Sequence, residues 1–181
     1  MSLAAEVRDQ LEPRRADMVD LLRRLVEIES PSDDRAGLDR FADALVELFG
    51  PLEEYVGPRG RNMALHVPAD GQPHAVALCH YDTVWPKGTL ERIPFSVDQD
   101  GVARGPGCFD MKAGIVVLHF ALEAVKNQLR RPLRVLFTCD EEVGSPTSRT
   151  LIEETARNAV VAYVLESPLP GGTLKTARKG T

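Results

Sequence analysis

The chain has 181 residues, of which 43% are hydrophobic and 27% are charged, and its formal net charge at pH 7 is -5. This length suits one domain with a sizeable core. No apolar run approaches the roughly 20 residues that would cross a bilayer, and the first ten residues lack the apolar core of a signal peptide. We therefore expect a cytoplasmic protein without a membrane partner. The acidic balance argues against a nucleic-acid partner, because proteins that bind nucleic acids usually carry a basic patch.

The first third of the chain predicts two amphipathic helices. Residues 14–28 place apolar side chains at helical spacing, and Pro13 suits the start of such a helix. Residues 36–49 show the same spacing, and Gly50 with Pro51 ends that helix.

The next segments alternate between strands and helices. Residues 62–68 alternate in polarity like a strand, and residues 74–81 are a nearly unbroken apolar run, typical of a strand buried on both faces. Asp100-Gly101 predicts a hairpin turn between two short strands. Four further elements are predicted: a buried helix at 112–129, a buried strand at 132–142, a helix at 145–158 with Ser145 as N-cap, and a third buried strand at 159–168.

Apolar strands that alternate with helices indicate an α/β domain, a three-layer sandwich with a largely parallel central sheet flanked by helices. In such sheets ligands bind beyond the carboxyl ends of the strands. Polar side chains follow the three buried strands, and one more precedes a helix in the loop GPGCFDMKAG. They are His80, Asp82, Asp110, Asp140, Glu141, Glu142 and Glu166.

Carboxylates that share a cleft repel one another, and a bound cation would remove that repulsion. Histidine nitrogen with carboxylate oxygen suits zinc, manganese or cobalt better than calcium or magnesium. The set exceeds the roughly four ligands of one zinc ion, so two metal ions that share a carboxylate are an economical arrangement. His80 and Asp82 share a strand face, so Asp82 could orient the imidazole. Of the adjacent Glu141 and Glu142, one could bind metal while the other acts as a base.

Each of these residues also has a structural explanation: a hydrogen-bonded core histidine, a solvated turn or a helix cap. Only their joint position at strand ends favours a metal centre. Lys112 could contact a ligand or be solvated, whereas His119 is expected to pack within its helix. The three cysteines, Cys79, Cys108 and Cys139, form no C-x-x-C pair and are expected to be small buried residues.

Two other classes of site find no support. GPGCFDMKAG has Asp110 where a dinucleotide-binding fingerprint needs glycine, and no G-x-x-x-x-G-K-[ST] loop is present. The G-x-S-x-G elbow of a serine hydrolase is also absent from the sequence.

The blocks HYDTVWP, GPGCFDMKAG, DEEVGS and YVLESP, in this order, resemble the zinc-dependent aminoacylase and carboxypeptidase family of metallopeptidases. That family includes glutamate carboxypeptidase, acetylornithine deacetylase and succinyl-diaminopimelate desuccinylase. HYDTVWPKGTL is most similar to the glutamate carboxypeptidase branch, and the resemblance runs from about residue 14 to the end.

The resemblance implies two divalent metal ions, with zinc expected and cobalt or manganese possible. His80 and Glu166 would bind the first ion, Glu142 the second, and Asp110 both. Asp82 would orient His80, and Glu141 would be the general base. A cis peptide bond is implied between Asp110 and Met111. The implied reaction is hydrolysis of an amide bond in an N-acyl amino acid or in a peptide with a free carboxyl end.

The sequence also departs from the family. A further histidine ligand would come from near the C-terminus, yet no histidine follows His119. The family's lid domain, which carries dimer contacts, would begin near the last residue of this chain. We therefore expect residues 1–181 to be the N-terminal part of an incomplete catalytic domain, inactive alone, from a longer homodimeric enzyme. A non-catalytic binding module that keeps the fold is the alternative.

Overall fold

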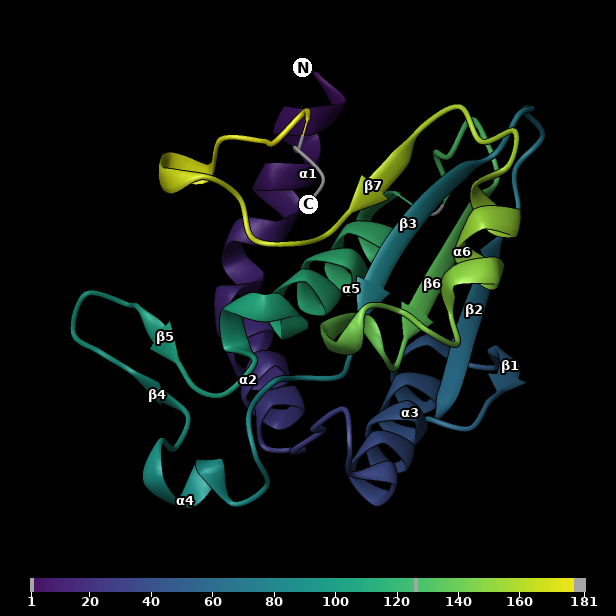
Figure 1. Cartoon of the computed structure of the whole chain (residues 1–181). Coiled ribbons are helices and arrows are strands. Elements are labelled where there is room, and N and C mark those ends of the chain that lie inside the picture. Colours follow the sequence, from purple (N-terminus) through teal and green to yellow (C-terminus); the bar gives the residue numbers. More distant parts are fainter. Residues whose placement is uncertain (1, 126, 178–181) are drawn as a thin grey trace.

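The computed structural model describes residues 2–125 and 127–177 and is built around a five-stranded sheet (Figure 1). The strand order is β1-β2-β6-β3-β7, where β6 and β3 pair in parallel, as do β3 and β7. Strand β2 is antiparallel to β6, and β1 is antiparallel to β2. The strands are β1 Glu53–Val56, β2 Arg61–Val67, β3 Ala75–His80, β6 Leu133–Thr138 and β7 Ala162–Val164. The predicted sheet is thus confirmed as a mixed sheet with a parallel centre.

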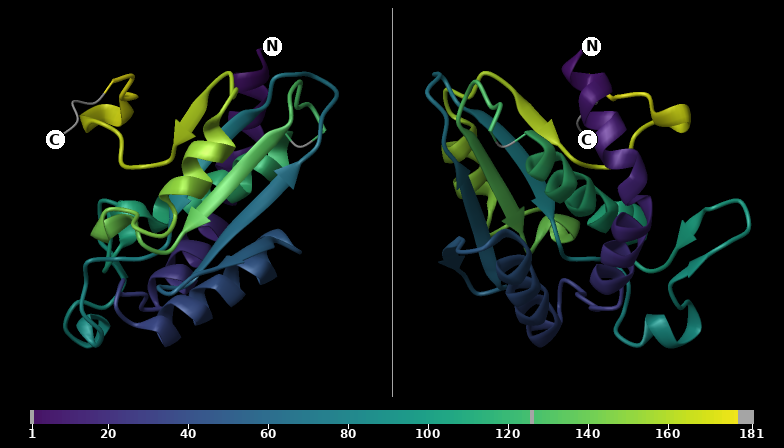
Figure 2. Two further views of the ribbon diagram at one scale, coloured as in Figure 1. Left: turned by 45° about the vertical axis from the view of Figure 1, so that its right-hand side comes forward. Right: turned by 180° about the vertical axis from the view of Figure 1, so that it is seen from behind.

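Helices cover both faces of the sheet and complete three layers. Figure 2 shows α1, α2, α3 and α5 on one side of the sheet and α6 on the other. The bounds are α1 Leu3–Leu11, α2 Arg15–Val26, α3 Arg35–Phe49, α5 Ala113–Val125 and α6 Arg149–Ala156. The helices α2, α3, α5 and α6 were predicted, with ends that differ by a few residues. Helix α1, capped by the Ser2 hydroxyl, was not.

Successive side chains of the two central strands, β3 and β6, point to opposite faces of the sheet. The residues of β3 and β6 that face α2, α3 and α5 join one apolar cluster with these helices: Ala75, Ala77, Cys79, Leu133, Val135 and Phe137. Full burial of one large aliphatic or aromatic side chain stabilises the fold by about 1.5–3 kcal/mol. All three cysteines are free and buried, as predicted, and burial raises the pKa of the Cys79, Cys108 and Cys139 thiols.

The segment of the chain between β3 and α5 extends away from the three layers. It contains α4 (Thr89–Arg92) and the hairpin of β4 (Ser96–Val97) and β5 (Ala103–Arg104), which confirms the turn predicted at Asp100-Gly101. Gly101 has a φ of +77°, a conformation that glycine adopts without steric cost.

Two sequence predictions on the C-terminal side are wrong. The third strand is not buried: β7 has only three residues, all of them are exposed, and it lies at the edge of the sheet. Ser145 does not cap α6, which begins at Arg149 with Ser148 in the N-cap position. Ser145 instead has a φ of +55° in the preceding turn.

Among the described residues, no helix combines the length and the apolar character that a membrane crossing requires.

Candidate metal centre

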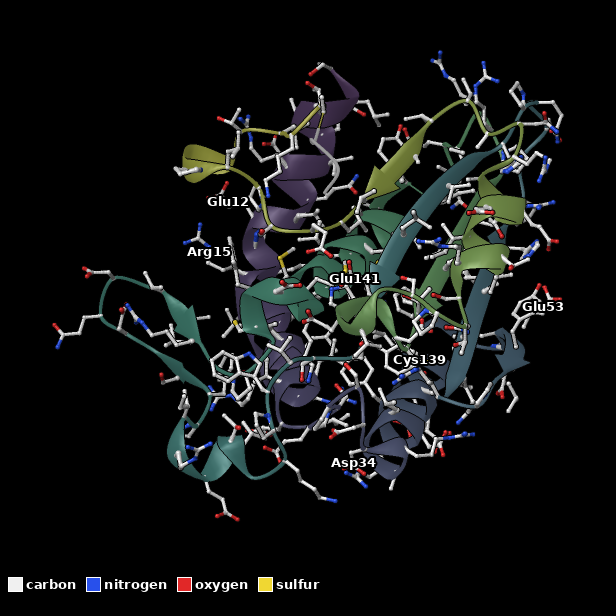
Figure 3. All side chains as sticks on the ribbon, in the orientation of Figure 1. Glu12, Arg15, Asp34, Glu53, Cys139 and Glu141 are labelled. Carbon is white, nitrogen blue, oxygen red and sulfur yellow. The ribbon has the colours of Figure 1, made fainter. Side chains whose placement is uncertain are left out.

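The candidate site lies where the parallel strands β6, β3 and β7 end. His80 is the last residue of β3, and Glu166 lies two residues beyond β7. Glu141 opens the short helix η3 (Glu141–Val143), which follows β6. Since neighbouring parallel strands end at the same edge, these side chains converge there. Figure 3 shows Glu141 at the centre of this region, beyond the end of β3.

His80 is the buried centre of the group, with 2% of its surface exposed. Its Nδ1 lies 3.0 Å from the backbone oxygen of Asp82, and since a carbonyl oxygen can only accept, Nδ1 is the donor of this hydrogen bond. The other nitrogen, Nε2, lies 3.0 Å from Asp110 Oδ1 and 3.1 Å from Glu166 Oε1. The ring therefore presents Nε2 to the carboxylates, the arrangement that a metal-binding histidine needs.

Asp82 connects His80 to the turn that carries the two glutamates. Its carboxylate is fully buried and accepts hydrogen bonds from the backbone N–H groups of Glu141 and Glu142, at 3.1 and 3.2 Å. Asp82 Oδ1 also lies 3.4 Å from His80 Nδ1. Asp82 therefore contacts the ring twice, once through its backbone oxygen and once through its carboxylate.

Asp110 reaches the site from η2 (Cys108–Lys112), the irregular turn before α5. The Asp110-Met111 peptide bond is cis, as the resemblance implied. Met111 is buried, and its sulfur accepts a hydrogen bond from the His80 backbone N–H at 3.0 Å. This contact holds the loop against the end of β3, while the Asp110 side chain stays 58% exposed toward the site.

Ligand atoms of the five predicted metal and base residues gather in two groups around His80. One group is His80, Asp110 and Glu142; the other is His80, Glu141 and Glu166; in each, the ligand atoms lie within 4.8 Å of one another. Glu141 Oε2 is 3.9 Å from His80 Nε2, farther than the nearest oxygens of Asp110 and Glu166.

The electrostatics of this group favour a cation. Burial, then the negative charges of neighbouring carboxylates, raises the pKa of both Glu141 and Glu142, although His80 opposes the shift. Burial alone would lower the pKa of His80, but Asp82 and Glu166 outweigh it and raise the pKa to about 11. Several anions that share one cleft are costly without a positive charge, so the donor set fits a divalent metal with nitrogen and oxygen ligands.

One acidic residue at the strand ends does not belong to the site. Asp140 is fully buried, and its carboxylate accepts hydrogen bonds from the Thr147 N–H, the Thr147 hydroxyl and the Ser148 hydroxyl, at 2.6–2.7 Å. It therefore shapes the turn that leads into α6. The sequence did not predict this structural role, because Asp140, Glu141 and Glu142 are adjacent and all three are equally suitable as site residues.

Sequence reasoning missed one residue that contacts the site, and both of its expectations for a second residue were wrong. Ser32 donates its hydroxyl to Asp82 Oδ2 at 2.7 Å. Lys112 is neither solvated nor aimed at a ligand: it is buried, and its Nζ donates to the Ile28 backbone oxygen at 2.8 Å. Both contacts join residues more than 45 positions apart, so only the tertiary structure reveals them.

Comparisons of sequence and of fold relate the chain to known proteins. The sequence profile of peptidase family M20/M25/M40 matches residues 77–178. Carboxypeptidase G2 of Pseudomonas sp. (strain RS-16) is 34% identical over 158 residues, which cover 82% of this chain and 37% of that protein. Succinyl-diaminopimelate desuccinylase of Acidiphilium cryptum is 32% identical, over 92% of this chain and 47% of that protein. Acetylornithine deacetylase of Salmonella arizonae is 29% identical, over 82% and 42%.

Solved structures share the fold. Human carnosine dipeptidase 1 superposes with a TM-score of 0.74 at 16% identity, covering 88% of this chain and 40% of that chain. An M20 family metallo-carboxypeptidase from Sulfolobus solfataricus gives 0.69 at 19% identity, with 86% and 38% covered. The chain thus spans less than half the length of these relatives.

Proposed function

Because the chain belongs to peptidase family M20/M25/M40, we propose that it supplies most of the catalytic groups for metal-dependent hydrolysis of an amide bond. The proposed substrate is an N-acyl amino acid or a peptide with a free carboxyl end. The names of three relatives, a carboxypeptidase, a deacetylase and a desuccinylase, support this class. The observation that carries the proposal is the convergence of four carboxylates around the ring of the buried His80, three of them within 3.9 Å of its Nε2.

His80, Asp110 and Glu166 would hold one divalent ion, and Asp110 and Glu142 a second, with zinc as the first choice. When bound, these ions would acidify a water molecule and polarise the substrate carbonyl. The Asp82 backbone oxygen accepts a hydrogen bond from His80 Nδ1, so Nε2 would be the nitrogen that gives up its proton and binds the metal. The closer approach of Asp110 and Glu166 than of Glu141 to Nε2 supports their roles as ligands.

Glu141 is the proposed general base. It would accept a proton from the attacking water through one carboxylate oxygen and deliver it to the nitrogen of the leaving amine. Its position supports this role: the carboxylate is 48% exposed, so water and substrate can reach it, and it lies just beyond the closest contacts to His80.

The full activity, in this proposal, also needs groups that residues 1–181 do not supply. These are one more histidine ligand for the second ion and a lid domain that closes over the substrate and forms a homodimer. The 181-residue chain alone is then expected to bind metal weakly and to show little turnover. The relatives' greater length supports this part of the proposal.

The test uses Glu141→Ala in an active polypeptide that contains this chain. We expect metal content to be retained and turnover of N-acyl amino acids to fall by at least about 100-fold, because general-base catalysis contributes on that order. Unchanged turnover would remove Glu141 from the role of base. If the unaltered polypeptide binds metal but hydrolyses neither N-acyl amino acids nor peptides with a free carboxyl end, the result would favour the alternative, a non-catalytic binding module.

A further inference from the structure

The turn after α2 forms a small parallel clamp on the segment that carries Asp82. Pro31 and Thr83 form an isolated parallel bridge, in which Thr83 N–H donates to the Ser30 oxygen at 2.9 Å and Ser32 N–H donates to the Thr83 oxygen at 3.3 Å. The buried Ser30 hydroxyl adds a bond to the Tyr81 backbone oxygen at 2.6 Å. The clamp therefore fixes the backbone on both sides of Asp82 from a segment about 50 residues earlier.

Ser32 extends the clamp to the Asp82 side chain. Its hydroxyl lies 2.7 Å from Asp82 Oδ2, the distance of a strong hydrogen bond to a carboxylate. The two backbone donors of Glu141 and Glu142 hold the same carboxylate from the side of η3. A buried carboxylate is stable only when such donors satisfy it, and their directions decide how it is oriented.

We propose that Ser32 is a positioning residue of the metal centre, which acts through Asp82 on His80. With the hydroxyl in place, the Asp82 carboxylate cannot turn away from His80 Nδ1, and the imidazole keeps Nε2 aimed at Asp110 and Glu166. Without it, Oδ2 loses its side-chain donor and the carboxylate gains freedom to rotate. This inference rests on the proposed function, because it assumes that His80 is a metal ligand.

The experiment is a titration of the metal-free chain with Zn²⁺, followed by calorimetry, together with the unfolding temperature without metal. We expect Ser32→Ala to weaken zinc binding by about tenfold, the lower end of the range for residues that orient metal ligands. Ser32→Thr keeps the hydroxyl and should restore most of the affinity.

Ser148→Ala is the matched control. It also removes a hydroxyl that donates to a buried aspartate, Asp140, at 2.6 Å, but outside the site. We expect it to lower the unfolding temperature and to leave zinc affinity unchanged. Wild-type affinity in Ser32→Ala, or an equal loss of affinity in Ser148→Ala, would overturn the role of Ser32. A wild-type chain without zinc affinity would overturn the proposed function itself, and this inference with it.

Discussion

At the scale of single residues, the surroundings of a carboxylate decide what it does. Asp110 and Asp140 both occur in polar blocks beside strand ends, and without the family resemblance nothing in the sequence pattern separates them. The structure gives Asp140 three donors in a fully buried position, whereas Asp110 is exposed and faces His80. Those donors come from residues 147 and 148, whose approach to Asp140 depends on a turn that no sequence pattern predicted.

This contrast predicts opposite effects for the two Asn variants. Asp140→Asn should lower the unfolding free energy by about 1–3 kcal/mol, because it weakens hydrogen bonds to a charged acceptor, and should leave zinc affinity unchanged. Asp110→Asn should abolish the zinc binding of the chain and cost no stability without metal, since it also relieves repulsion with nearby carboxylates. Urea unfolding and calorimetry measure the two effects. Loss of zinc affinity in Asp140→Asn would contradict the assignment.

The environment of His119 also leads to a testable prediction, on the pH dependence of stability. It packs against the Phe49 and Phe120 rings, and its Nε2 lies 3.7 Å from Glu123 Oε1. Burial lowers the pKa of His119; Glu123 opposes this shift and Arg14 adds to it. The packed position confirms the sequence prediction for this residue.

The lowered pKa means that the unfolded chain, with an ordinary histidine pKa of about 6.5, takes up the proton first as the pH falls. Stability contributed by neutral His119 is therefore complete above that pH and is lost below it. We expect the unfolding free energy of the wild type to fall relative to that of His119→Leu when the pH is lowered from 7.5 to 5.5. Urea unfolding at both values measures it, and a difference that is the same at both would refute this explanation.

At the scale of elements, the most predictable feature of the site is the meeting of strand ends. Apolar runs that end in His80, in Glu141 and Glu142, and in Glu166 indicated neighbouring parallel strands, and β3, β6 and β7 are such strands. The exposure of β7 was not predictable, because an apolar run has the same composition at a sheet's edge as in its centre. The clamp from Ser30 to Ser32 could not be predicted from the sequence either, since it depends on contacts between segments that are distant in the chain.

Helix α5 packs closely against the segment after β7, which carries Glu166. Gly114 of α5 faces this segment so closely that an added Cβ would meet the Leu165 backbone oxygen at 2.0 Å. Gly114→Ala should therefore displace residues 165 and 166, lower stability by about 1–3 kcal/mol and weaken zinc binding. Val117→Ala, at an exposed position of the same helix, is the control and should change neither quantity much. Unaltered zinc binding in Gly114→Ala would show that Glu166 does not depend on this contact.

At the scale of the whole molecule, the three layers and the parallel centre of the sheet follow from periodicity, but the antiparallel β1 and β2 do not. Strand direction is set by how the chain returns to the sheet, and a short connection such as that between β1 and β2 is compatible with an antiparallel pair. The sheet nevertheless serves one purpose for the site: it brings ligands from separate segments to a single edge. That edge is the basis of the proposed metal centre.

The most direct test is calorimetric titration of the metal-free 181-residue chain with Zn²⁺ at pH 7, beside His80→Ala. We predict that the wild-type chain binds zinc, with weak occupancy of the second position, and that His80→Ala loses the stronger binding by more than about 100-fold, beyond the effect expected of residues that only orient a ligand. A wild-type chain that binds no zinc, or a His80→Ala chain that binds it as tightly, would contradict the metal centre.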